Sequence, residues 1–287
     1  MNRVLAEAIE QLHLPRAVAS MSLSGGCMHD VFHVELVDGS SVVCKQARGA
    51  HGGDMLRSEQ VSLAAIAGTM TIRTPDVAGL CIVADQHVLV MTYLESGAEG
   101  DWPAFGRSLG ALHCATVDAQ WGFPTDTWLG GFRQPNSPMD DWHGFLRTAR
   151  LEPQVRLAVD SGGVPDATRR MLETILNRLP TLVPVPARAS LVHGDLWSGN
   201  CLVTSDGSVA VLDPAVWIGD AWADIAMAGL FGALPQSMTA AWTQVVGDTD
   251  GARERVAVHQ LYHLLNHLNL FGGGYLSAVE STARKLV

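Results

Sequence analysis

Hydrophobic and polar residues alternate over four stretches in the first third of the chain, as expected for strands that bury one face. The predicted strands cover residues 31–37, 41–46, 77–84 and 87–94. Between the second and third strands, apolar residues recur at helical spacing over residues 54–67. The small, polar segment 95–100 follows the last strand and predicts a boundary. The first part of the chain is therefore expected to be β-rich.

Beyond residue 100 the pattern changes to helical spacing. The predicted helices cover residues 102–114, 140–160 and 165–179, and helical spacing resumes near residue 221 and continues to the end. Short apolar runs within residues 191–211 interrupt this pattern and predict a small β patch. A β-rich part followed by a mainly helical part indicates an α+β, two-lobed fold. We expect an N-terminal lobe over residues 1–95 and a C-terminal lobe over residues 96–287.

Composition narrows the classes of partner. The chain has 287 residues, 47% of them hydrophobic, and a net charge of −10. An acidic chain argues against nucleic acid as the main partner, because phosphate binding depends on Lys and Arg. No apolar run reaches the roughly 18–20 residues that span a membrane. We therefore expect neither a nucleic-acid nor a membrane partner.

Cysteine usage and the first residues indicate a cytoplasmic protein. The five cysteines are scattered and form no CxxC pair, which argues against a disulfide framework or a cysteine-rich zinc site. Glu7 and Glu10 fall where a secretory signal would be apolar, so residues 4–12 are expected to form a helix instead.

The strongest chemical signal is HGDLWSGN at residues 193–200, followed by an apolar run that ends at Asp213. Phosphoryl transfer needs a carboxylate to orient and deprotonate the attacking hydroxyl, which suits Asp195. It also needs oxygen ligands for Mg²⁺, which Asn200 and Asp213 can supply. The alternative is that Gly-Asp and Asp-Pro are ordinary turn pairs, but the complete ordered motif argues against it.

A second signal lies in the predicted N-terminal lobe. Gly25 and Gly26 would let the backbone approach phosphates, although a glycine pair is also common in hairpins. Lys45 stands inside an apolar strand, where a lysine is paired or functional. Glu59, on the following helix, is its predicted partner. The alternative is an edge-strand lysine and a solvated glutamate.

These motifs resemble those of protein-kinase-like small-molecule kinases and, among them, the fructosamine (ketosamine) kinase family. HGDLWSGN and the tail NLFGGGY at residues 269–275 carry the resemblance, which extends over about residues 18–280. It implies ATP-dependent phosphorylation of the 3-hydroxyl of a ribulosamine, erythrulosamine or fructosamine, a deglycation activity. The acceptor would be a small-molecule ketosamine or a glycated lysine side chain. A monomer and a homodimer both stay open.

The resemblance also assigns roles to residues. It implies a catalytic base at Asp195, Mg²⁺ ligands at Asn200 and Asp213, a phosphate-binding pair at Lys45 and Glu59, and an adenine-contacting strand at Met91, Tyr93 and Leu94. Some relatives carry a redox-sensitive cysteine in the glycine loop, which makes Cys27 a redox candidate. The alternative for Cys27 is a small buried thiol.

Several further residues are candidates for acceptor binding. Trp197 and Trp217 flank the motif and could stack on a sugar or pack in the core. Asp220 could contact a cationic amine or cap the helix after it. His267 recurs on one helical face with His259 and His263, a spacing that fits the acceptor pocket, core packing or a metal site.

The sequence differs from protein kinases at two motifs, and two alternative functions stay open. Asp213-Pro214-Ala215 replaces the DFG of protein kinases, and Gly194 replaces the Arg of their HRD motif. The short segment between Asp213 and Asp224 leaves no room for a long activation loop. The first rival is a kinase of the same fold with an aminoglycoside- or choline-type acceptor. The second is a nucleotide-binding pseudokinase, which the intact motif set argues against.

Overall fold

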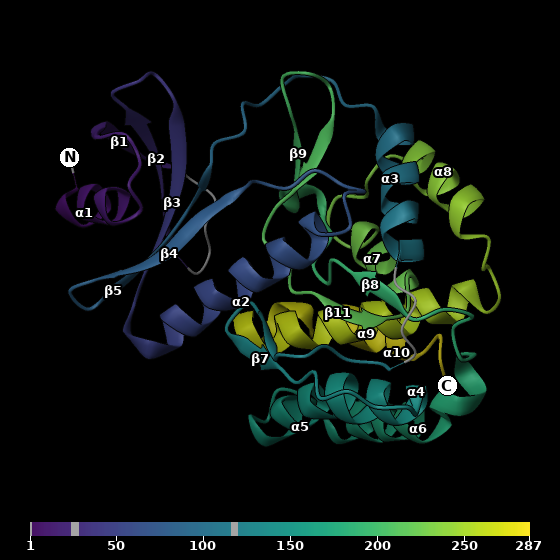
Figure 1. Cartoon of the computed structure of the whole chain (residues 1–287). Helices are drawn as coiled ribbons and strands as arrows, with labels where there is room; N and C mark the ends of the chain where they lie inside the picture. The colour runs from purple at the N-terminus through teal and green to yellow at the C-terminus, as the bar shows by residue number, and fades with distance from the viewer. Residues whose placement is uncertain (1, 24–28, 116–119) are drawn as a thin grey trace. The chain divides into compact units, whose positions relative to one another are not determined.

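The computed structural model describes residues 2–23, 29–115 and 120–287, which form two compact units (Figure 1). The first unit contains Met1–Asp101 and Cys201–Ala215, and the second contains Trp102–Asn200 and Val216–Val287. The first unit is thus discontinuous in sequence, whereas the predicted boundary at residue 95 placed all of residues 201–215 in the C-terminal lobe.

A five-stranded antiparallel sheet forms the centre of the first unit, with the order β1-β2-β3-β5-β4. Its strands are β1 (Ala17–Leu23), β2 (Asp30–Leu36), β3 (Ser41–Arg48), β4 (Val77–Val83) and β5 (Gln86–Thr92). Alternate residues of β5 enter two separate cores, as the pleat of a strand requires. Val88 and Val90 pack with α1 (Arg3–Gln11), while Leu89 and Met91 pack with α2 (Gly49–Ala67).

The hairpin of β9 (Cys201–Val203) and β10 (Val209–Val211) belongs to the first unit because of its backbone hydrogen bonds. The amide of Val211 donates to the carbonyl of Arg73, and the amide of Gly97 donates to that of Val203. The Arg73 side chain also pairs with Asp206 at 2.8 Å. These contacts join the hairpin to segments far away in sequence, a pairing that periodicity alone does not reveal.

The second unit is mainly helical (Figure 1). Its helices are α3 (Trp102–Ala115), α4 (Trp142–Phe145), α5 (Glu152–Asp160), α6 (Asp166–Leu182), α7 (Trp222–Ala228), α8 (Gln236–Val246), α9 (Ala252–Phe271) and α10 (Leu276–Ala283). A π-helical turn, Leu146–Leu151, joins α4 to α5, so the predicted helix over residues 140–160 is one continuous helical stretch. The long helix α9 packs against α5, α7 and α10.

Two short strand pairs complete the second unit. β8 (Ser190–Val192) pairs with β11 (Trp217–Gly219), which holds the HGDLWSGN segment at the end of β8. β6 (Thr127–Leu129) pairs with β7 (Phe132–Gln134), between the predicted helices over residues 102–114 and 140–160. Strands of three residues are too short to show a period of two, which explains why the pattern missed β6, β7 and β11.

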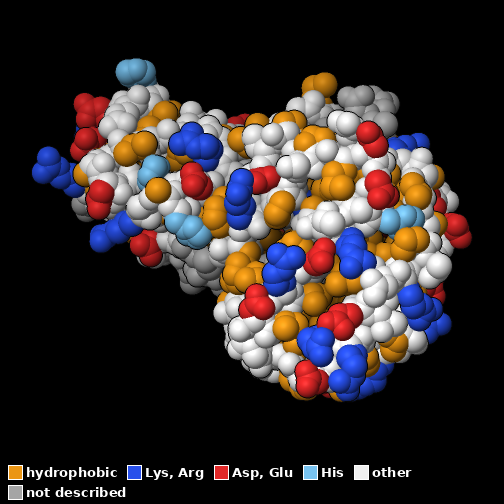
Figure 2. All heavy atoms as spheres, turned by 90° about the horizontal axis from the view of Figure 1, so that it is seen from below, with side chains coloured by type: hydrophobic (Ala, Val, Ile, Leu, Met, Phe, Trp, Pro, Cys, Tyr) orange, Lys and Arg blue, Asp and Glu red, His pale blue; other side chains and the backbone are white. Residues whose placement is uncertain are grey.

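The charged side chains on the surface and the hydropathy of the helices are relevant to which partners the chain could bind. Figure 2 shows acidic and basic side chains interspersed over the face in view. Within the described parts of the chain, no helix is both long enough and apolar enough to cross a bilayer.

Candidate active site

Lys45, Glu59 and Asp213 converge in the first unit. Lys45 lies on β3 and is 8% exposed, and its Nζ donates to Glu59 Oε1 of α2 at 2.6 Å. The same Nζ donates to Asp213 Oδ1, just beyond the end of β10. Asp213 has a φ of +54°, an uncommon left-handed conformation for a residue other than glycine. The structure therefore brings together the lysine–glutamate pair and the second predicted metal ligand.

One buried ammonium faces two carboxylates in this set. Burial and the Asp213 charge raise the pKa of Glu59 and the Lys45 charge lowers it, which together place it at about 7. Burial alone would lower the pKa of Lys45, but the charges of Glu59 and Asp213 raise it above its ordinary value. Lys45 is therefore a firmly held cation, the form that phosphate oxygens bind.

Asp195 stands in the loop after β8, in the second unit. Asn200 Nδ2 donates to the Asp195 carbonyl at 2.9 Å and to its Oδ2 at 3.1 Å. The Asp195 amide donates to His193 Nδ1 at 3.2 Å. Gly194 between them has a φ of +82°, which glycine adopts without strain. The loop thus fixes the carboxylate of a half-buried aspartate at its centre.

Asp224 of α7 anchors this loop. Its Oδ2 accepts from the His193 amide at 2.8 Å and its Oδ1 from the Gly194 amide at 2.9 Å. His113 Nε2 lies 3.0 Å from Oδ2, and Trp242 Nε1 donates to His113 Nδ1 at 2.8 Å. Because Nδ1 accepts, Nε2 carries the proton and donates to Asp224. Burial opposes ionisation, but these hydrogen bonds and His113 hold the pKa of Asp224 below its ordinary value. The sequence analysis did not identify His113 or Trp242 as members of this network.

Asn200 in the second unit and Asp213 in the first each carry the kind of side-chain oxygen that Mg²⁺ prefers as a ligand. Asn200 uses its Nδ2 on Asp195, and no described residue hydrogen bonds to its Oδ1, so that oxygen is available to a cation. The Asp213 side chain is 50% exposed and so is accessible to a ligand.

The predicted nucleotide-binding residues have different environments. The Met91 side chain is buried in the core beneath α2, so it faces away from solvent. Tyr93 is exposed and lies with its ring 4.4 Å from that of His33, and Leu94 is half-buried. The adenine contact of this segment stays a prediction. Gly25, Gly26 and Cys27 lie outside the described residues.

The two tryptophans near the catalytic loop differ in accessibility. Trp217 is 2% exposed and lies parallel to Trp142, with Arg150 Cζ 4.3 Å from its ring centroid. A sugar cannot stack on this ring, which corrects its prediction as an acceptor residue in favour of core packing. Trp197 is half-buried and covers Gly199, where a Cβ would lie 2.3 Å from its ring. Trp197 keeps its prediction as an acceptor contact.

Asp220 is buried in a network of its own. It accepts two hydrogen bonds from Arg255, at 2.6 and 2.9 Å, and one from the Trp222 amide. His259 Nε2 lies 3.1 Å from Oδ2. Burial would raise the pKa of Asp220, but His259 and Arg255 lower it strongly. Both oxygens are engaged and Asp220 is 1% exposed, so the predicted contact with a substrate amine is wrong. Its side chain instead accepts from the Trp222 amide at the start of α7, whose N-cap is Ala221.

The three histidines of α9 do not share a function. His259 bonds to Asp220, His263 is buried, and His267 Nδ1 donates to the His263 carbonyl at 2.9 Å. Among the described residues, no three His, Cys, Asp or Glu side chains converge as metal ligands. His267 instead contacts three aromatic rings that the sequence analysis did not assign, those of Phe231, Phe271 and Tyr275.

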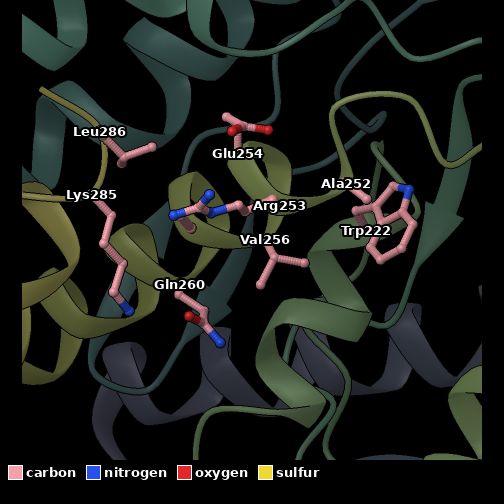
Figure 3. Close-up of a pocket in the computed structure, with 9 residues that line it drawn as sticks. Trp222, Ala252, Arg253, Glu254, Val256, Gln260, Lys285 and Leu286 are labelled. Atoms are coloured by element: carbon pink, nitrogen blue, oxygen red, sulfur yellow. The ribbon is translucent and has the colours of Figure 1, made fainter.

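A pocket of about 520 Å³ lies elsewhere in the second unit, beside the start of α9 and the end of the chain (Figure 3). Its lining includes Trp222, Arg253, Gln260 and Lys285. None of the lining residues belongs to the catalytic loop, so this pocket is not assigned to the acceptor.

Comparisons with known proteins identify the family of the chain. The family model described as fructosamine kinase matches residues 1–287. A Synechocystis protein named "Probable ketoamine kinase" is 37% identical over 267 residues, covering 92% of this chain and 88% of that protein. The chloroplastic protein-ribulosamine 3-kinase of Arabidopsis thaliana is 32% identical over 263 residues, covering 91% and 80%. A Thermobifida fusca structure described as a fructosamine-3-kinase is 30% identical, with a TM-score of 0.89 and coverage of 99% and 98%.

Proposed function

The chain belongs to the fructosamine kinase family and is an ATP-dependent kinase, and from this premise we propose that it phosphorylates the 3-hydroxyl of ketosamines. The observation that carries the proposal is the geometry of the catalytic loop. Asp195 is held by Asn200, and the loop backbone is bonded to the ionised carboxylate of Asp224. A fixed, accessible carboxylate suits the orientation and deprotonation of an acceptor hydroxyl.

The first unit supplies the groups for the phosphates. Lys45, kept cationic by Glu59 and Asp213, would bind phosphate oxygens. Asp213 would be a Mg²⁺ ligand, and the family resemblance implies Asn200 of the second unit as another. When bound, ATP and Mg²⁺ would supply the phosphoryl group and the positive charge that neutralises it. Glu59 positions the lysine and needs no contact with the nucleotide.

The acceptor class rests on the relatives, whose names specify ketoamines and ribulosamines. We assign ribulosamines, erythrulosamines and fructosamines as the acceptor class, either as small molecules or on lysine side chains. This would make the chain a deglycation enzyme. The scattered cysteines, of which Cys44 and Cys81 are free and buried, support a reducing cytoplasm as its location.

The test is ATP consumption by the purified chain with Mg²⁺ and one acceptor at a time. The acceptors are the ribulosamine, erythrulosamine and fructosamine of lysine, with choline and an aminoglycoside as comparisons. We expect turnover on ketosamines alone, with phosphate on the 3-hydroxyl of the product. Turnover on choline or the aminoglycoside but on no ketosamine would overturn the acceptor class and leave the kinase activity.

A matched variant shows whether the turnover comes from this chain or from a contaminating kinase in the preparation. Asp195→Asn keeps the shape of the side chain but removes its basicity, so ketosamine turnover should disappear with it. Tight nucleotide binding without turnover on any acceptor would favour a regulatory role instead.

A further inference from the structure

Four rings pack together at the C-terminal end of α9, and we refer to them as the aromatic cluster: Phe231, His267, Phe271 and Tyr275. The His267 ring lies at the centre, 4.5 Å from Phe231, 5.6 Å from Phe271 and 5.2 Å from Tyr275, measured between centroids. Phe231 and Tyr275 are perpendicular at 6.2 Å. The cluster therefore combines three carbon-ring faces with one imidazole.

The cluster is open to solvent and is not an extension of the core. Phe271 is 57% exposed, and the other three rings are half-buried. Gly272 has a φ of +84°, a conformation that favours glycine, and it ends α9 there. The following turn brings the Tyr275 ring back to His267. Exposed aromatic rings gathered at one place indicate a binding surface.

The hydrogen bonds of His267 define which ring nitrogen is available. Its Nδ1 faces the carbonyl of His263 at 2.9 Å, and a carbonyl can only accept, so Nδ1 carries the proton. Burial lowers the pKa of His267, which keeps the ring neutral near pH 7. Its Nε2 is then a lone-pair acceptor, and no described residue donates a hydrogen bond to it.

The aromatic cluster is joined to the catalytic loop within the same unit. Ser198, three positions beyond Asp195, donates from its Oγ to the Phe231 carbonyl at 3.4 Å. Gly232, which follows Phe231, has a φ of +66°, and a Cβ on it would lie 3.2 Å from Ser198 Oγ. A ligand on the cluster would therefore lie beside the loop that carries the proposed base.

We propose that the aromatic cluster binds the protonated amine of the ketosamine acceptor. A secondary ammonium carries a positive charge and N–H donors, and the cluster offers ring faces for the charge and His267 Nε2 for a donor. Ring faces attract cations within about 6 Å of their centroids. This assignment rests on the proposed function, because it takes the ketosamine as the acceptor.

The test compares a charged and a neutral acceptor on the same variants. The charged acceptor is the ribulosamine of lysine, and the acceptor called neutral is the same molecule acetylated on the secondary ketosamine nitrogen, which removes the charge there and keeps the sugar. Phe271→Leu and Tyr275→Leu should each raise the KM of the charged acceptor by about fivefold to thirtyfold. The KM of the neutral acceptor and that of ATP should change less than about twofold. Phe271→Tyr retains a ring and should restore most of the affinity.

Leu157→Ala provides the matched control, because Leu157 is a 40% exposed apolar residue of α5 outside the cluster. Equal KM changes for the two acceptors, or none in either, would overturn the amine site while ketosamine turnover by the wild-type chain preserved the proposed function. A wild-type chain without ketosamine turnover would overturn both. Thermal unfolding of each variant separates loss of binding from loss of fold.

Discussion

Asp195 has a role that a single substitution can isolate. Asp195→Ala removes the proposed base but leaves Lys45 and its partners in the first unit unchanged. We expect turnover to fall by at least about 10²-fold, the usual contribution of a general base. The Kd for ATP, measured by calorimetry, should change little. Loss of ATP binding in this variant would show that Asp195 has a different role.

Buried His263 predicts how stability depends on pH. Burial, with the neighbouring His267 and His259, lowers its pKa to about 3. The unfolded chain takes up this proton below about pH 6.5, whereas the folded chain does so only near pH 3. His263 therefore lowers the free energy of unfolding as the pH falls through that window. From pH 7.5 to 5.0 its share should be about 2 kcal/mol.

His263→Gln tests this dependence, because glutamine does not titrate. Denaturant unfolding of the variant should lose less stability between pH 7.5 and 5.0 than that of the wild-type chain. The difference between the two pH values is the readout, so a uniform loss of stability in the variant does not affect it. An unchanged difference would mean that folding does not lower the pKa of His263.

At the scale of elements, the packing of α3 against α8 depends on a glycine. A Cβ at Gly106 would lie 2.2 Å from the Met238 carbonyl oxygen, a backbone atom that cannot move aside easily. Gly106→Ala should destabilise the chain by about 1–3 kcal/mol, the usual cost of overpacking.

Gly110 on the same helix is the matched control. A Cβ there would lie 2.7 Å from the Cβ of Val245, a smaller overlap than the 2.2 Å at Gly106, so a smaller displacement of α8 would relieve it. Thermal unfolding should show a smaller loss for Gly110→Ala than for Gly106→Ala. Equal losses would mean that the helices separate as readily at Gly106 as at Gly110.

Elements with a full hydrophobic period were predictable from the sequence, and short or glycine-rich ones were not. Strands β2 to β5 lie within a few residues of the predicted ranges, because each buries alternate side chains. Helix α2 begins at Gly49, earlier than predicted, because Gly52 and Gly53 have no side chain to show a period. Gly53 is instead required by its contact with the His87 ring, 2.5 Å from where a Cβ would lie.

Some functional residues were predictable from sequence motifs, whereas others could be assigned only from their burial and contacts in the structure. The sequence motifs identified Lys45, Glu59 and Asp213, which the structure joins through hydrogen bonds. Trp217 was ambiguous because a tryptophan serves a core and a sugar site equally, and only its burial distinguishes them. The aromatic cluster was missed because Phe231 lies far from α9 in sequence, and no local pattern indicates that it meets His267.

At the scale of the whole molecule, the oligomeric state can be tested through Cys27, the redox candidate. Burial raises the pKa of the Cys44 thiol to about 12 and also that of Cys81, which makes both poor targets for oxidation. We expect peroxide to lower activity and to produce a disulfide-linked dimer through Cys27. Gel filtration with light scattering and non-reducing electrophoresis should show this for the wild-type chain and not for Cys27→Ala. Equal peroxide sensitivity in both would contradict the prediction.

The discontinuous first unit limits how this protein can be divided or recombined. A cut after Asp101 would leave the first unit without β9 and β10, and so without Asp213 and the backbone partner of Arg73. The polypeptide passes from one unit to the other three times, after Asp101, after Asn200 and after Ala215. An exchange of gene segments at a single crossover therefore cannot transfer either unit whole. The two halves of the chemistry must be inherited together, and a change of acceptor must arise by substitution within the chain.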